Sequence, residues 1–202
     1  MLFGLLLDSC KEPAWVDKEL TNFDNSETTI KKEIPIAKKG NLSAFYTSTK
    51  HKQLQLGLDS LEEGFNGLQI RIWYDSIYVN KQKLVTILYT DGKWKAKVYR
   101  MRSTGSEYFV FSKDAKSLTP KTGWDNFSNR LLNLNILTLP DGMALDNCGG
   151  GGGDGGGYNI EVATKKHYRF YSYWEPQYYH DKCKYARSMI DILNLIEQEL
   201  GV

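Results

Sequence analysis

The sequence has no long apolar run and no cluster of basic residues. A helix that spans a membrane needs about 20 predominantly apolar residues, and no segment of this chain approaches that length. Lys and Arg number 26 against 24 Asp and Glu, and the two signs are interspersed along the chain. A nucleic-acid partner needs a clustered basic face. These two absences argue against a membrane-spanning helix and against a nucleic-acid-binding protein.

The short motifs of common catalytic and metal sites are also missing. The chain has three histidines (His51, His167 and His180), and none stands in a metal-binding pattern such as His-Glu-x-x-His. There is no Gly-x-Ser-x-Gly nucleophile elbow. The glycine-rich segment 149–157 leads into a strand pattern, whereas a phosphate-binding loop leads into a helix. The sequence therefore predicts a flexible loop there, no metal and no cofactor, and it favours a non-enzymatic domain.

Cysteine is scarce, and the first of the three cysteines has a distinctive context. An apolar stretch over residues 2–7 ends in Leu7-Asp8-Ser9-Cys10, and the chain turns polar after Cys10. This pattern, followed by Lys-Glu, resembles the start of small lipoproteins of the Bacteroidota with no assigned function, with a truncated signal peptide. The resemblance implies an acylated Cys10 as mature N-terminus and a lipid anchor in the outer membrane, on its periplasmic or surface face. The alternative is an ordinary N-terminal helix stub that contains a cysteine.

The other two cysteines form an even pair once Cys10 is set aside. Disulfides form and persist in oxidising compartments such as the cell envelope. A bond between Cys148 and Cys183 would connect the start of the glycine-rich segment to the last predicted helix. The alternative is two unpaired, partly buried thiols, because the sequence does not show whether the two Cα atoms come within range.

The chain divides into a signal remnant over residues 1–10, a polar tether over 11–40 and one globular domain over 41–202. Alternation of apolar and polar residues predicts strands, and spacing of three and four residues predicts helices. Asp91-Gly92 between two strand patterns indicates a tight hairpin. Residues 40–60 fit either a strand or a short helix. The expected strands cover 68–74, 83–90, 93–101, 107–111, 158–164 and 167–174, and the expected helices cover 122–135 and 181–200.

This order of elements predicts an α+β fold, with an antiparallel sheet of about five to seven strands and two helices packed on one face. In the strand 93–101, Trp94, Ala96 and Val98 alternate with three lysines, which predicts one buried face and one lysine row in water. The helix 122–135 is expected to start at Thr122 and the helix 181–200 at Asp181.

Aromatic residues are dense over 167–179, and strand alternation divides those of 167–174 into two rows. One row, expected in the core, is Tyr168, Phe170 and Trp174; the other is Arg169, Tyr171 and Tyr173. The second row either packs under another layer or forms an exposed platform for a sugar ring, a peptide or a partner protein. The exposed platform predicts that Tyr171→Ala and Tyr173→Ala cost little stability.

Three functional hypotheses follow. The first is a lipid-anchored cell-envelope protein whose non-enzymatic domain binds an unknown envelope protein or glycan. The second is an exported hydrolase of glycans or peptides, with Glu161 and Glu175 as the carboxylates. The third is an accessory subunit of an envelope complex. An enzyme predicts a concave pocket that holds polar groups of shifted pKa, and a binding module predicts an open aromatic face.

Overall fold

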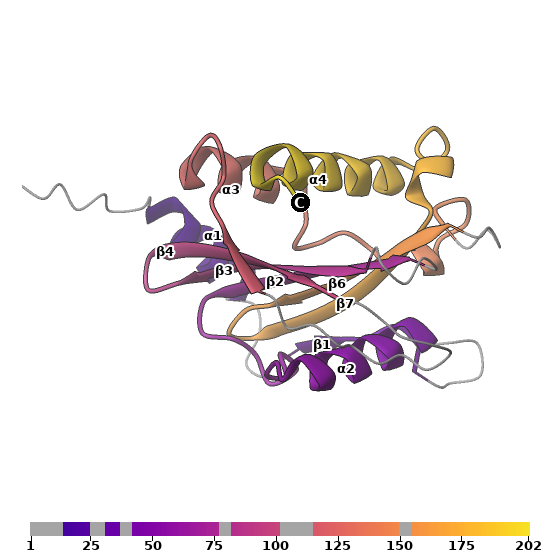
Figure 1. The fold of residues 1–202 in the computed structure, drawn as a ribbon, viewed down its shortest axis with the longest axis horizontal. Helices are drawn as coiled ribbons and strands as arrows, with labels where there is room; N and C mark the ends of the chain where they lie inside the picture. The colour runs from indigo at the N-terminus through magenta and orange to yellow at the C-terminus, as the bar shows by residue number, and fades with distance from the viewer. Residues whose placement is uncertain (1–13, 25–30, 37–41, 77–81, 102–114, 150–154) are drawn as a thin grey trace, which may run out of the picture.

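The computed structural model describes residues 14–24, 31–36, 42–76, 82–101, 115–149 and 155–202. In these residues the strands form one seven-stranded sheet in the order β1-β7-β6-β2-β3-β4-β5 (Figure 1). The α+β class is confirmed. The strands are β1 Lys31–Glu33, β2 Leu68–Ser76, β3 Lys83–Thr90, β4 Lys93–Arg100, β5 Ala115–Leu118, β6 Gly156–Ala163 and β7 His167–Trp174. The helices are α1 Ala14–Asp24, α2 Ala44–Leu56, α3 Trp124–Asn133 and α4 Lys184–Leu200, with short 3₁₀ turns η2 Gly142–Ala144 and η3 Pro176–Tyr178.

The strands β2, β3, β4 and β5 form an antiparallel meander, and β6 and β7 form a second antiparallel pair. Asp91 and Gly92 connect β3 to β4 with φ angles of 52° and 71°, the positive values that a tight two-residue hairpin requires. In β4, Trp94, Ala96 and Val98 are buried while the lysines between them are exposed. The predicted hairpin and its lysine row are confirmed. The expected strand over 107–111 lies outside the described residues.

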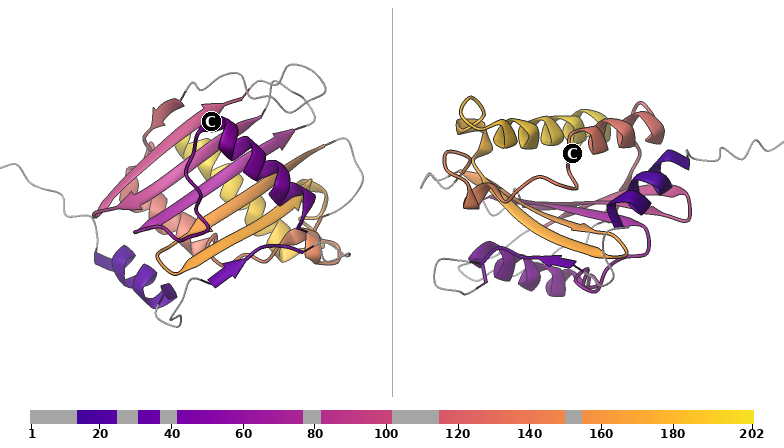
Figure 2. Two further views of the ribbon diagram at one scale, coloured as in Figure 1. Left: turned by 90° about the horizontal axis from the view of Figure 1, so that it is seen from below. Right: turned by 180° about the vertical axis from the view of Figure 1, so that it is seen from behind.

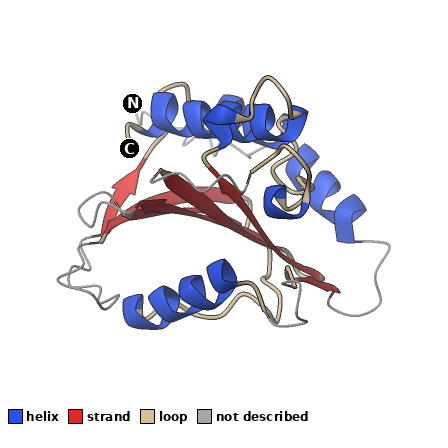
Figure 3. Cartoon of the chain, turned by 90° about the vertical axis from the view of Figure 1, so that its right-hand side faces the viewer, coloured by secondary structure: helices blue, strands red, loops and turns tan. Residues whose placement is uncertain are grey.

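Helices lie on both faces of the sheet. The helices α3 and α4 cover one face, and α2 crosses the opposite face (Figure 3). The larger core lies under α3 and α4, where alternate residues of β2, such as Ile70 and Ile72, meet Met189 and Ile196 of α4. The prediction of two helices did not include α2. Figure 2 shows α2 running across the strands from below.

The helix α2 lacks the apolar stripe that would have predicted it. Its buried side chains are Tyr46, Thr49, Lys52, Gln53 and Leu56, three of which are polar or charged. A helix with polar residues on its buried side has no apolar period, so the sequence over residues 40–60 fits strand and helix equally well.

The prediction of a polar tether over residues 11–40 is wrong in its described part. The segment contains α1 and β1, and β1 extends the sheet by pairing parallel to β7, so the sheet is mixed. Val16 and Leu20 of α1 are buried in the larger core. These two residues stand four positions apart on a helix of only 11 residues, and so short an apolar stripe is easily overlooked. The first helix of the described residues therefore begins at Ala14, four residues after Cys10.

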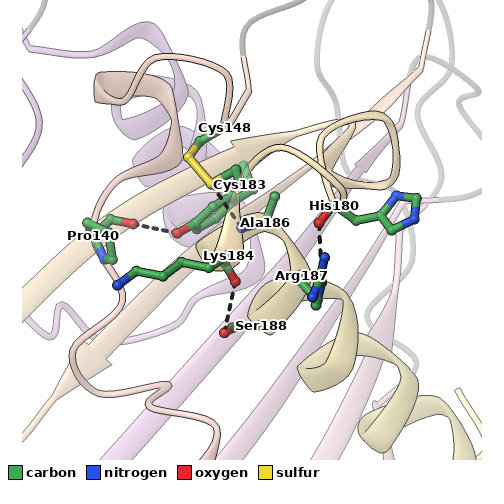
Figure 4. Close-up of a disulfide and its surroundings, with 9 residues drawn as sticks. Pro140, Cys148, His180, Cys183, Lys184, Ala186, Arg187 and Ser188 are labelled. Carbon is green, nitrogen blue, oxygen red and sulfur yellow. Dashed lines mark hydrogen bonds between the residues drawn. A yellow bond between two sulfur atoms is a disulfide. The ribbon is translucent and has the colours of Figure 1, made fainter.

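The structure contains the predicted disulfide between Cys148 and Cys183, with the two Cα atoms 5.1 Å apart (Figure 4). Cys183 is also the N-cap of α4, because its Sγ accepts a hydrogen bond from the backbone N–H of Ala186. The predicted cap, Asp181, lies two residues earlier. Thr122 likewise does not cap α3, which begins after Gly123; its hydroxyl donates a hydrogen bond to Glu199 of α4.

Candidate functional site

The predicted aromatic platform is wrong, because Tyr171 and Tyr173 are only 1% and 0% exposed. The segment that follows α3 lies over them. The Tyr171 hydroxyl donates a hydrogen bond to the Ile136 carbonyl at 2.7 Å, and the Tyr173 hydroxyl donates one to the Pro140 carbonyl at 2.8 Å. These aromatic side chains belong to the core.

Arg169, the third residue of that row, fixes the same segment. Its guanidinium donates hydrogen bonds to the Leu137 and Leu139 carbonyls and forms an ion pair with Glu33 of β1. The row of Arg169, Tyr171 and Tyr173 therefore holds a connecting segment on the sheet and offers no open surface. The alternation of the two rows is confirmed, since Tyr168 and Phe170 are buried on the opposite face, under α2.

We expect Tyr171→Phe to lower the free energy of unfolding by about 1–2 kcal/mol, because it removes a buried hydrogen bond and leaves the Ile136 carbonyl without its partner. Tyr178→Phe is the matched control. Because Tyr178 is 70% exposed, this variant should lower the free energy of unfolding by less than about 0.5 kcal/mol. Urea denaturation of both variants measures the difference. Equal losses would contradict the buried role of Tyr171.

The structure does not bring Glu161 and Glu175 together. Glu161 pairs with Phe170 across β6 and β7, and Glu175 follows Phe170 by five residues. At about 3.3 Å per residue of strand, this places the two residues about 17 Å apart along the sheet. The carboxyl groups of a glycosidase lie about 5–9.5 Å apart. This pair therefore lacks the geometry of glycoside hydrolysis.

Glu161 is instead the centre of a buried charged cluster between α2 and the sheet. The Glu161 carboxylate accepts hydrogen bonds from Lys50 Nζ at 2.7 Å, Trp73 Nε1 at 2.9 Å and the Tyr168 hydroxyl at 2.9 Å. Arg71 Nη1 lies 3.8 Å from the same carboxylate. Arg71 is the cross-strand neighbour of Glu161 on β2, and the Glu161 side chain is 0% exposed. Through the hydrogen bond from Lys50 of α2, Glu161 holds α2 on the sheet.

A second ion pair extends this polar layer along α2. Lys52 Nζ lies 2.7 Å from Asp75, whose other carboxylate oxygen accepts a hydrogen bond from Asn159. Three buried atoms of the layer, Thr49 Oγ1 and the Nε and Nη1 of Arg71, have no hydrogen-bond partner in the described part of the chain. The polar layer explains why a helix without an apolar stripe packs on this face.

On the opposite face, three residues of neighbouring strands form the floor of a cavity. Tyr74 of β2 pairs with Lys83 of β3 on one side and with Tyr158 of β6 on the other. All three side chains therefore stand in one row across the sheet, on the face that α4 covers. The rings of Tyr74 and Tyr158 meet edge to face, with their centroids 5.4 Å apart.

The helix α4 forms the roof of this cavity. Ile190, Leu193, Asn194 and Glu197 line it, and their spacing of three and four residues places them on one side of the helix. Pro176, Gln177 and Val202 complete the lining. The cavity has a volume of about 280 Å³, just below the usual range of about 300–1,000 Å³ for sites that bind small molecules.

The cavity contains one cation and one carboxylate among its described lining residues. Lys83 Nζ lies 4.2 Å from the centroid of the Tyr74 ring. Burial lowers the pKa of the Lys83 ammonium, and the Glu197 carboxylate offsets only part of this effect. Burial also raises the pKa of the Tyr74 and Tyr158 hydroxyls, so both tyrosines stay protonated at neutral pH. The cavity thus presents aromatic faces, one amine and one carboxylate.

A wider hollow of about 430 Å³ lies between α3 and α4. Most of its lining side chains are exposed, and its cation, Arg130, is already paired with Glu199 at 2.7 Å. The first cavity has the more enclosed lining, so we take it as the candidate site.

Sequence reasoning missed this cavity, although its aromatic residues were visible. Tyr74 ends the alternating pattern of β2 and Tyr158 begins that of β6, but only the strand register shows that they are neighbours. Glu197 and Asn194 look like ordinary polar positions of an amphipathic helix.

The described residues contain no group of three or more His, Cys, Asp or Glu side chains placed to hold a metal ion. No helix among them has the length and apolar character needed to cross a membrane.

Comparison of the chain with protein-family models, with curated proteins and with solved structures gives no match. Function is therefore inferred from this chain's own residues.

Proposed function

We propose that the chain is a lipid-anchored cell-envelope protein, acylated at Cys10, whose domain binds a small ligand without catalysis. The disulfide between Cys148 and Cys183 carries the proposal, because such bonds persist in oxidising compartments outside the cytoplasm. The Leu7-Asp8-Ser9-Cys10 pattern supports the same compartment and adds the anchor.

The binding site in this proposal is the cavity under α4. A concave pocket is also expected of an enzyme. The chemistry of the lining residues therefore decides between a binding domain and an enzyme. The described lining residues include a single carboxylate side chain, that of Glu197, and no Ser, Cys, Thr or His that would serve as nucleophile or base. Both tyrosines remain protonated, which further favours binding over hydrolysis.

The alternative is that the domain binds another protein, as an accessory subunit of an envelope complex would. A protein partner needs an exposed surface, whereas the aromatic row Arg169, Tyr171 and Tyr173 is covered. The enclosed cavity therefore favours a small ligand.

We expect protein extracted from native membranes to carry a diacyl or triacyl group on Cys10, detectable by mass spectrometry of the N-terminal peptide. Cys10→Ala should release the protein into the soluble fraction, since the anchor supplies the membrane affinity. Cys148→Ala is the control, because it changes a cysteine of the domain and should leave the protein in the membrane fraction. An unmodified Met1 on native protein would disprove the anchor.

The binding part of the proposal has its own test. Mass spectrometry of the intact protein under non-denaturing conditions should detect a retained small molecule. Leu193→Trp, which fills the cavity from α4, should abolish its retention. A retained molecule that survives this change would place binding elsewhere.

A further inference from the structure

The sheet face on which α2 lies is covered in one half and open in the other. Figure 2, in its view from below, shows α2 over one half of the sheet and no helix over β4. Across the strands, Lys97 of β4 stands in the same row as Arg71 of β2 and Glu161 of β6, which lie under α2. Lys93 and Lys95 therefore project from the same face as Lys97, and all three are exposed. We call these three residues the lysine row.

The open half of this face carries positive charge only. Among the described residues, none of the three ammonium groups of the lysine row forms an ion pair. The neighbouring strands β3 and β5 contribute apolar or hydroxyl-bearing side chains to this face, namely Leu84, Thr86, Leu88, Thr90, Ala115 and Ser117. The acid nearest in sequence is Asp91, in the turn before β4. Strand alternation thus collects on one surface three lysines that the sequence intersperses with apolar residues.

The position of the lysine row relative to the N-terminus indicates what this surface faces. Asp17 of α1 accepts a hydrogen bond at 3.0 Å from the hydroxyl of Tyr89. Tyr89 pairs with Trp94, which stands between the first two lysines of the row. Figures 1 and 2 show α1 at the same end of the sheet as the β3–β4 turn. Because α1 begins four residues after Cys10, and four residues span at most about 14 Å, an acyl group on Cys10 would keep this end of the sheet close to the membrane.

We propose that the lysine row contacts the anionic lipid headgroups of the membrane in which Cys10 is anchored, and that this contact orients the domain. Lipid phosphates complement the ammonium groups, and the tether raises their local concentration around the row. A few lysines alone bind such a surface weakly, so the acyl group retains the protein and the row sets its orientation. This inference rests on the proposed lipid anchor, because the anchor brings the row to the membrane.

Vesicle binding by the full-length Cys10→Ala protein tests the contact without any contribution from acylation. At low ionic strength, the protein should sediment with vesicles that contain phosphatidylglycerol, which is anionic, and should not sediment with vesicles of phosphatidylcholine alone. The binding should disappear in about 1 M salt, where the Debye length falls to about 3 Å.

Substitutions in the same Cys10→Ala background assign the binding to the row. Each change of one row lysine to glutamine should weaken binding to phosphatidylglycerol vesicles about fivefold, and the triple change should weaken it about 100-fold. The matched control removes three exposed cations at the start of α4, by combining Lys182→Gln, Lys184→Gln and Arg187→Gln. This control should weaken binding less than the loss of a single row lysine.

The orientation of the anchored protein has a separate measurement. Acylated protein in phosphatidylglycerol vesicles is treated with an amine-acetylating reagent, and the modified lysines are identified by mass spectrometry. The lysine row should react several-fold more slowly than Lys182 and Lys184, which lie at the start of α4. In phosphatidylcholine vesicles this difference should disappear.

The outcomes separate the inference from the anchor on which it rests. The inference is wrong if the Cys10→Ala protein does not bind phosphatidylglycerol vesicles, binds phosphatidylcholine equally well, or keeps its affinity after the triple change in the row. Equal acetylation of all the lysines compared in the anchored protein would also overturn it. None of the vesicle results with Cys10→Ala depends on acylation, whereas an unmodified N-terminus on native protein would refute the anchor alone.

Discussion

Glu161→Gln is expected to lower the free energy of unfolding by about 3–5 kcal/mol, among the largest effects of any single substitution in this chain. The change removes the negative charge that Lys50 and Arg71 share in the interior. It also replaces one of the two carboxylate oxygens by an amide N–H₂, so either Trp73 or the pair of Lys50 and Tyr168 faces a donor in place of its acceptor. Chemical denaturation with the folded state monitored by tryptophan fluorescence measures the loss.

Glu63→Gln is the matched control. Glu63 pairs with Lys32 at 2.6 Å, as short as the 2.7 Å contact between Glu161 and Lys50, but its side chain is 78% exposed. Exposed ion pairs contribute about 0–1 kcal/mol. The losses in the free energy of unfolding of Glu161→Gln and Glu63→Gln should therefore differ by several kcal/mol, because only Glu161 is buried.

Adding Lys50→Met to Glu161→Gln should restore part of the lost stability, because the second change removes one of the unpaired cations. A loss below about 1 kcal/mol for Glu161→Gln alone would show that the charged cluster does not hold α2 on the sheet.

Removing the disulfide is expected to lower the free energy of unfolding by about 4 kcal/mol. The bond joins residues 35 positions apart, and the entropy of closing such a loop in the unfolded chain gives this value. The change corresponds to a fall in melting temperature of about 8–16 °C for a chain of this size. Thermal unfolding of a Cys148→Ser, Cys183→Ser variant measures it.

Serine at position 183 makes it possible to measure the contribution of the disulfide to stability separately from that of the α4 N-cap. Cys183 Sγ caps α4 at Ala186, and a serine hydroxyl preserves that acceptor. Cys148→Ser with Cys183→Ala should therefore lose about 1 kcal/mol more than the double serine variant. Dithiothreitol should destabilise the wild-type protein and leave both variants unaffected; a wild-type melting temperature insensitive to reductant would contradict the structural role of the bond.

The part of the fold that could be predicted from sequence is the part fixed by local patterns. The β3–β4 hairpin follows from Asp91-Gly92, and the two faces of β7 follow from alternation. The stripe of α4 follows from helical spacing. In each case the signal and the structure lie within the same ten to twenty residues.

The polar layer under α2, the cover over Tyr171 and the candidate site could not be predicted, because each depends on contacts between distant segments. Lys50 and Glu161 are 111 residues apart, and neither position has a local pattern that identifies the other as its partner. Tyr171 is covered by the segment that contains Ile136, whose carbonyl accepts its hydrogen bond, and the sequence of that segment has no apolar periodicity. The cavity requires the register of three strands, which alternation within each strand does not specify.

The short strand β1 has a consequence for the order of folding. Lys31 pairs with His167, so the edge of the sheet joins segments 136 residues apart. Pairings between such distant segments form slowly, because the entropy of closing a long loop is lost before the contact forms. β1 therefore joins the sheet only after the C-terminal hairpin has been synthesised, and the sheet cannot be completed before nearly the whole chain is available.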